Sequence, residues 1–138
     1  MTTRLRIIGA ASGLGAQDRG CADGPVAFHR SQAWHKLADE RHVDWARTLF
    51  PPAMPGAAPV ERVAVLCREL ADEVALTLGN GDFPLVIGGD HSVAIGTWSG
   101  VARAAGMPVG LLWIDAHLDS HTPESSYSGA LHGMPLAC

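Results

Sequence analysis

Two stretches in the second half of the chain decide the fold: residues 83–92 (FPLVIGGDHS) and residues 109–119 (VGLLWIDAHLD). Each begins with a continuous apolar run, which is typical of a strand buried on both faces of a parallel sheet, and each ends in polar residues. Residues 91–105 are predicted to form the helix between them, since the sequence GMP at 106–108 stops it. This order predicts an α/β fold in which helices cover a parallel sheet.

The first half of the chain continues the same alternation. The sequence predicts a strand at 4–9, a glycine-rich loop at 10–25, a helix at 26–41, a second strand at 42–49 and a proline-rich linker at 50–59. From residue 60, apolar residues recur every three or four positions, which predicts an amphipathic helix that ends at Gly79. A further helix is expected to begin at Met134.

Composition limits the class of protein. A length of 138 residues suits one domain, and 47% hydrophobic with 17% charged residues excludes a disordered chain. The net charge of -4 argues against nucleic-acid binding, and no apolar run approaches the roughly 20 residues of a membrane span. The three cysteines lack metal-type spacing and read as reduced thiols. We therefore expect a cytoplasmic protein.

The polar residues after the two apolar runs predict a metal site. Ligands bind beyond the carboxyl ends of parallel strands. If the two strands are adjacent, their ends lie about 5 Å apart, and His91 could then reach the second cluster. In an extended backbone, Asp115, His117 and Asp119 would point to one side. Such crowding costs several kcal/mol unless a cation or proton neutralises it. The ligand types suit Mn, Fe, Co or Zn and favour Mn; charges facing water at an exposed strand end are the simpler alternative.

The polar stretch 120–133 is expected to lie over the strand ends and contact a substrate. Its last imidazole, His132, is a candidate for proton transfer, although a histidine in a loop is commonly just solvated. A glycine-rich turn at 9–15 (GAASGLG) resembles the nucleotide-binding turn of short-chain dehydrogenases. Gly20, Gly24 and Pro25 break the helix that such a turn requires, so we set this interpretation aside.

With these motifs in place, the sequence resembles the ureohydrolase family, and within it the arginases. The resemblance lies in residues 88–92 (GGDHS), 113–119 (WIDAHLD), 122–135 (TPESSYSGALHGMP) and, more loosely, 20–25 (GCADGP). It implies a three-layer α/β/α parallel sheet, two Mn²⁺ ions bridged by hydroxide, a small guanidino substrate and a homo-oligomer.

The resemblance also implies roles for single residues. His91, Asp115 and Asp119 match ligands of one Mn²⁺, while His117 matches a ligand of the other and Asp115 bridges both. His132 and Asp119 match catalytic positions. Ser128 and His121 match substrate-binding positions. The implied reaction hydrolyses an arginine-like guanidino compound to urea and an amine.

The sequence departs from the arginase pattern at three places. His121 and Ala130 stand where arginases have asparagines that read an α-carboxylate, and the later Ser-X-Asp-X-Asp motif of the family is absent. We therefore expect residues 1–138 to be the N-terminal portion of a single ureohydrolase domain, with an incomplete sheet. Three alternatives stay open: a non-catalytic fragment or partner-binding half of such an enzyme, an agmatinase-type or other guanidino or formimino hydrolase of the same family, and a zinc deacetylase with one metal.

Overall fold

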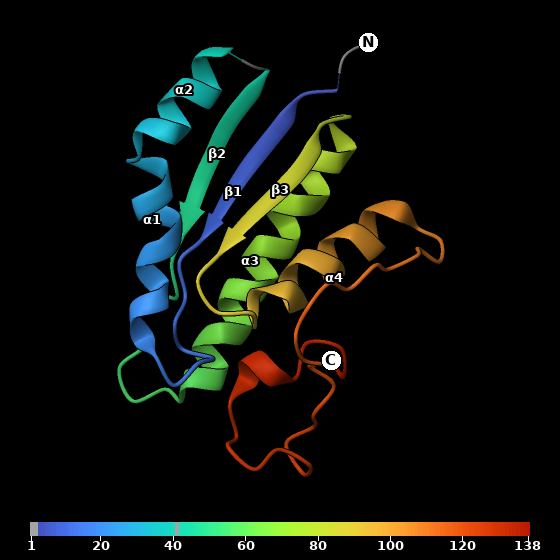
Figure 1. Ribbon diagram of the computed structural model, residues 1–138. Coiled ribbons are helices and arrows are strands. Elements are labelled where there is room, and N and C mark those ends of the chain that lie inside the picture. Colours follow the sequence, from blue (N-terminus) through green and yellow to red (C-terminus); the bar gives the residue numbers. More distant parts are fainter. Residues whose placement is uncertain (1–2, 41) are drawn as a thin grey trace.

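The centre of the fold is a parallel sheet of three strands. The computed structural model describes residues 3–40 and 42–138, and within them the sheet contains β1 (Leu5–Ala10), β2 (Val43–Leu49) and β3 (Phe83–Gly88). The order is β2-β1-β3, so the first strand of the chain is the central one (Figure 1). Leu5 pairs with Val43 on one side and with Phe83 on the other. All three carboxyl ends therefore meet at one edge of the sheet.

Two short helices, α1 (Gly24–His29) and α2 (Gln32–Glu40), cover one face of the sheet (Figure 1). They follow a 3-10 helix, η1 (Arg19–Asp23), which lies within the predicted loop. An aromatic cluster fills the space beneath them: Phe28 and Trp34 pack on Trp45 of β2, with ring centroids 6.3 and 5.4 Å apart. Ile7 of β1 is fully buried against this cluster.

The other face of the sheet is covered by α3 (Pro59–Gly79), with α4 (Val93–Ala105) packed against it. The apolar stripe predicted from the sequence is the buried face of α3, where Leu66, Leu70 and Val74 contact Ile8 of β1. Full burial of each such side chain contributes about 1.5–3 kcal/mol. Helices on both faces of a parallel sheet confirm the predicted three-layer α/β class. Within the described residues, no helix is long and apolar enough to cross a bilayer.

The predicted strand at 109–114 is wrong in this structure. These residues carry no strand and are largely exposed, Leu112 at 81% and Ile114 at 89%. A strand needs a neighbour for its backbone N–H and C=O groups, and none of the described strands pairs with this segment. The condition that the two apolar runs form adjacent strands is therefore not met, because within the described residues β3 pairs with β1 alone. Consequently β3 is an edge strand, and its Phe83 and Leu85 are exposed rather than buried.

Several predicted helices have different limits. The helix expected over 26–41 is two helices, because the Ser31 hydroxyl accepts a hydrogen bond from the Trp34 N–H and starts α2 anew; residue 41 lies outside the described residues. The helix expected from 91 begins at Val93. No helix begins at Met134 within the described chain, and a short 3-10 helix, η2 (Leu131–Gly133), precedes it. The linker at 50–59 is irregular up to the start of α3, as predicted.

Candidate metal centre

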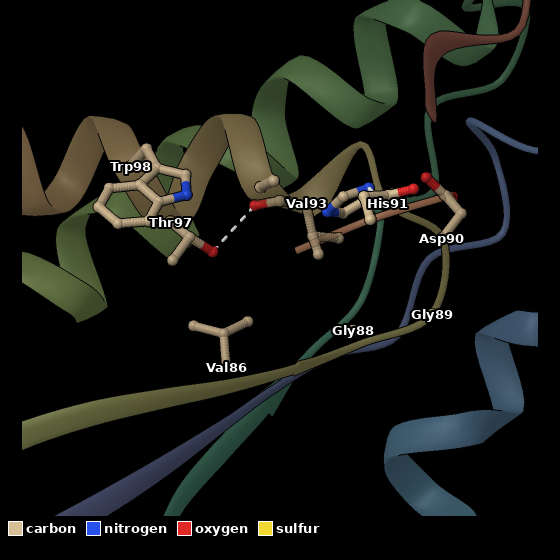
Figure 2. Close-up of a pocket in the computed structure, with 10 residues that line it drawn as sticks. Val86, Gly88, Gly89, Asp90, His91, Val93, Thr97 and Trp98 are labelled. Atoms are coloured by element: carbon tan, nitrogen blue, oxygen red, sulfur yellow. Dashed lines mark hydrogen bonds and ion pairs between the residues drawn. The ribbon is translucent and has the colours of Figure 1, made fainter. Parts of the chain in front are cut away.

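The turn between β3 and α4 places Asp90 and His91 at the carboxyl edge of the sheet (Figure 2). The Gly89 N–H donates to the Ala10 carbonyl at the end of β1 (3.0 Å), and the Asp90 N–H donates to the Ser12 carbonyl (2.7 Å). A side chain at Gly89 would collide with that Ser12 carbonyl, so glycine is required for the close approach. The turn is thereby fixed to the loop that follows β1.

Three side chains converge at this edge. His91 Nδ1 lies 2.7 Å from Asp119 Oδ2 and 3.1 Å from Asp115 Oδ2. One ligand atom from each residue can be chosen so that all lie within 4.8 Å of one another. The Asp119 side chain is 8% exposed and is withdrawn from water, whereas Asp115 lies at the exposed rim of the cluster. Two carboxylates around one imidazole concentrate negative charge at a single point.

Local backbone geometry sets the direction of the two carboxylates. Asp119 has a φ of 50°, the left-handed region that aspartate tolerates better than most residues. Its carbonyl accepts a hydrogen bond from the Leu136 N–H (2.9 Å). Asp115 Oδ1 accepts the N–H of His117 at 2.8 Å. That hydrogen bond, followed by the nearby imidazoles of His91 and His117, holds the pKa of Asp115 below its usual range, so this carboxylate stays ionised.

The His91 ring stacks on Trp113, with ring centroids 4.8 Å apart and an interplanar angle of 29°. The contact restrains the plane of the imidazole, as hydrogen bonds commonly do for metal-binding histidines. Sequence reasoning gave Trp113 no role beyond packing. Its position two residues before Asp115, at the end of an apolar run, is the sequence feature that places it near the metal cluster.

His117 does not join the cluster. Its side chain is 82% exposed, and its Nδ1 lies 3.6 Å from Asp115 Oδ1. The predicted alternation of 115, 117 and 119 requires an extended backbone, but the chain turns here and Asp119 is left-handed. The structure therefore brings together three of the four predicted ligands.

The predicted substrate and proton-transfer residues divide between two cavities. His121 and His132 line a cavity of about 600 Å³ together with the three clustered residues. His121 Nδ1 lies 3.2 Å from the Ser125 hydroxyl, and the His132 N–H donates to the Gly15 carbonyl at 3.1 Å. Ser128 instead lines a neighbouring cavity of about 400 Å³, and its hydroxyl accepts the Ala130 N–H.

A third, open cavity of about 480 Å³ lies between β3 and α4 (Figure 2). His91 and Asp115 border it at one end, and Val86, Val93 and Trp98 form its apolar part. The cluster is thus accessible from two sides.

The donor set suits a divalent cation. One imidazole nitrogen and two carboxylate oxygens are the ligands preferred by Mn²⁺, Fe²⁺ and Zn²⁺, and the absence of thiolate from the set favours the harder ions. A cation would also neutralise the buried carboxylate of Asp119 and the neighbouring carboxylate of Asp115. His91, Asp115 and Asp119 can therefore hold one ion, and His117 stands next to Asp115.

The chain is similar to known arginases along nearly its whole length. The family model described as "Arginase family" matches residues 3–138. The arginase of Bacillus caldovelox is 38% identical over 96% of this chain and 47% of its own length, and human arginase-1 is 35% identical over 96% and 43%. The native crystal structure of the B. caldovelox enzyme superposes with a TM-score of 0.86 at 34% identity, covering 99% of this chain and 48% of that one.

The chain thus spans about half the length of the curated relatives that it matches. Its sheet likewise corresponds to part of the sheet in the solved arginases. The family model covers almost every residue, and both relatives exceed 30% identity over nearly the whole chain. This chain belongs to the arginase family.

Proposed function

We propose that the protein containing this chain hydrolyses an arginine-like guanidino compound to urea and an amine, with Mn²⁺ as its cofactor. The observation that carries the proposal is the convergence of His91, Asp115 and Asp119 at the carboxyl edge of the sheet. When bound, such a metal would lower the pKa of a water and so make a nucleophile available at neutral pH. His91, Asp115 and Asp119 would hold it, and His117, whose imidazole lies beside Asp115, is the proposed ligand of a second ion.

The residues of this chain would serve the reaction by positioning and proton transfer. A guanidinium carbon is stabilised by resonance and resists attack by ordinary water. Hydrolysis would form a bond from a water oxygen to that carbon and break the bond from carbon to the substituted nitrogen. This nitrogen would have to gain a proton to leave as an amine, and the added oxygen would lose its proton to give urea. His132 lines the same cavity as the ligand cluster and is the proposed proton carrier. Asp119, which contacts His91 and is nearly buried, would help hold the metal and so position the attacking water.

The substrate's distal end is proposed to contact His121 and Ser128. His121 lines the cavity that contains the ligand cluster, and Ser128 lines the neighbouring cavity. Ala130 offers no side-chain hydrogen bond where arginases have an asparagine. We therefore propose an arginine-like substrate and keep an agmatinase-type substrate, which lacks the carboxylate, as the alternative within the family.

The test is urea release by the complete protein. Activity is expected only with Mn²⁺, and Asp115→Ala should abolish it. His35→Ala, at an exposed histidine on α2 far from the cluster, is the matched control and should keep full activity. Full activity of a chelator-treated Asp115→Ala variant would reject the proposal.

A non-catalytic, single-metal fragment is the second candidate, because only three ligands of one site converge in the described residues. Calorimetric titration of the 138-residue chain with Mn²⁺ separates the candidates. Two tight sites contradict the fragment hypothesis, whereas one weak site supports it. The same stoichiometry tests the zinc deacetylase alternative.

We further propose that residues 1–138 form the N-terminal portion of a single ureohydrolase domain. The match of the family model to 3–138 and the coverage of less than half of each curated relative support this. A cytoplasmic location, supported by the free thiols of Cys21, Cys67 and Cys138, and a homo-oligomeric assembly of the complete protein belong to the same proposal.

A further inference from the structure

Asp90 is a buried carboxylate beside the candidate metal centre with no part in the reaction proposed above. It is 5% exposed, and its oxygens accept three hydrogen bonds. Oδ2 accepts from the Ser12 hydroxyl (3.2 Å) and from the Gly15 N–H (3.0 Å), while Oδ1 accepts from the Ser92 N–H (2.9 Å). One side chain thus connects the turn after β3 to the loop after β1.

These contacts form a short path between the metal cluster and the proposed proton carrier. Asp90 precedes His91 directly. On the other side it holds the N–H of Gly15, whose carbonyl accepts the N–H of His132 (3.1 Å). The segment that carries His132 is therefore attached to the His91 turn through Gly15 and the Asp90 carboxylate.

The close packing at Gly15 is a second, independent observation that the loop after β1 is fixed against Asp90. A Cβ at Gly15 would lie 2.5 Å from Asp90 Oδ1 and 2.7 Å from the Ser92 hydroxyl oxygen. Both distances are shorter than van der Waals contact, so even alanine would displace the carboxylate or the loop. The loop after β1 can approach Asp90 only because position 15 lacks a side chain.

A carboxylate is required at this position by the arrangement of donors. Two backbone N–H groups, of Gly15 and Ser92, point at opposite oxygens of Asp90. An amide has one oxygen and one NH₂ group, so either orientation of an asparagine would set its NH₂ against one of these N–H donors. A buried donor left without an acceptor costs about 1–3 kcal/mol. A carboxyl group, with an acceptor oxygen for each donor, satisfies both.

We propose that Asp90 is a positioning residue that fixes the His132 segment and the His91 imidazole relative to each other, without contacting metal or substrate. The benefit of this role to catalysis rests on the proposed function. The attachment of the His132 segment through Asp90 can be tested without metal. Loss of the Asp90 carboxylate should release Gly15, loosen the His132 segment and weaken Mn²⁺ binding at His91.

The experiment uses the 138-residue chain with two variants and one control. Asp90→Asn removes the ionised acceptor, and Gly15→Ala displaces it sterically from the other side. Thr77→Val is the matched control: Thr77 is also buried, its hydroxyl donates to the Glu73 carbonyl, and it lies on α3 near Gly79, away from the carboxyl edge of the sheet. Thermal unfolding records the loss of stability in each.

Two measurements decide the outcome. Amide hydrogen exchange at His132 in the metal-free chain should be at least about tenfold faster in Asp90→Asn and Gly15→Ala than in wild type, and unchanged in Thr77→Val. The Kd for Mn²⁺ alone should rise by about tenfold in the same two variants and not in the control. If Asp90→Asn does not fold, Gly15→Ala carries both measurements.

Different results would overturn the positioning role of Asp90 and the proposed function. Unchanged exchange at His132 in the folded variants overturns the positioning role, even if wild type binds Mn²⁺ tightly. Equally faster exchange at His132 in Thr77→Val would overturn it too, because the effect would then reflect a general loss of stability. A complete protein that releases no urea with Mn²⁺ contradicts the proposed function, while exchange at His132 still decides the role of Asp90.

Discussion

His91 Nδ1 lies 2.7 Å from Asp119 Oδ2, although the two residues sit 28 positions apart in different loops. The contact depends on the left-handed backbone of Asp119, whose φ is 50°. Position 119 therefore combines two requirements. It needs a ligand oxygen, and it needs a residue that tolerates a positive φ.

Substitutions at Asp119 separate these requirements. Asp119→Asn keeps a side chain suited to the left-handed region but removes the charge, so Mn²⁺ affinity should fall by at least tenfold, about 1.4 kcal/mol, with little change in metal-free stability. Asp119→Ala should lose affinity equally and also lower stability by about 1–2 kcal/mol, because alanine is strained there. Calorimetry with Mn²⁺ and chemical denaturation measure the two effects. Equal stability of both variants would contradict the strain argument.

The crossing of α3 and α4 should be sensitive to a single methyl group at Gly96. A Cβ there would lie 2.6 Å from the Cys67 carbonyl on α3. Gly96→Ala should therefore destabilise the fold by about 1–3 kcal/mol, seen as a lower midpoint of urea unfolding. Gly79→Ala is the control, since nothing lies within 4 Å of its Cβ, and it should leave stability unchanged or raise it by up to about 1 kcal/mol. A Gly96→Ala variant as stable as Gly79→Ala would show that the helices are not packed this closely.

The thiols should differ in reactivity. Burial raises the pKa of Cys67 above its ordinary value of 9.0, whereas Cys138 is exposed. At pH 8, iodoacetamide should alkylate Cys138 well before Cys67, as followed by mass spectrometry of the peptides. In urea the two rates should become similar, and early alkylation of Cys67 in the folded chain would contradict its burial.

The raised pKa of Cys67 also has a consequence for stability. The folded state holds this proton more tightly than the unfolded state does. The corresponding stability is present below about pH 9 and is lost as the pH rises through the folded pKa. Cys67→Ala should show a smaller decline in unfolding free energy between pH 8 and pH 10.5 than wild type. An identical decline would mean that other groups cause it.

The exposed segment at 109–114 should contribute little to the stability of this chain. Ile114→Thr, at a side chain 89% exposed, is expected to change the free energy of unfolding by no more than about 0.5 kcal/mol. Leu66→Ala, in the core between α3 and the sheet, should cost about 2–5 kcal/mol. Denaturant titration compares them. A loss above about 2 kcal/mol in Ile114→Thr would show that the segment is packed as a buried strand.

The sequence predicted best those elements whose partners lie within the chain. The apolar stripe of α3 that includes Leu66 and Leu70 is buried against a single apolar surface, which the sheet provides. The apolar run at 109–114 carries an equally strong pattern, yet pattern alone does not say whether a strand has a neighbour. The division of the helix at Ser31 depends on one hydroxyl and its hydrogen bond, which periodicity does not register.

The sequence predicted only part of the ligand cluster, because the rest depends on the local backbone conformation. His91 and Asp115 follow from residue type and from their places after apolar runs. The direction of His117 depends on the local backbone, which turns instead of staying extended, and the left-handed φ of Asp119 has no signal in a single sequence. Asp90 was overlooked because its partners, Gly15 and Ser12, lie more than 70 residues away.

The central position of β1 bears on how this chain folds during synthesis. Both neighbours of β1 follow it in the chain, one ending at Leu49 and the other at Gly88, so β1 leaves the ribosome before either of them. At roughly 5–20 residues per second, several seconds pass before its second edge can be paired. Throughout that interval an apolar β-strand has open hydrogen-bonding groups, so nascent chains of this protein should depend on chaperones that bind extended segments.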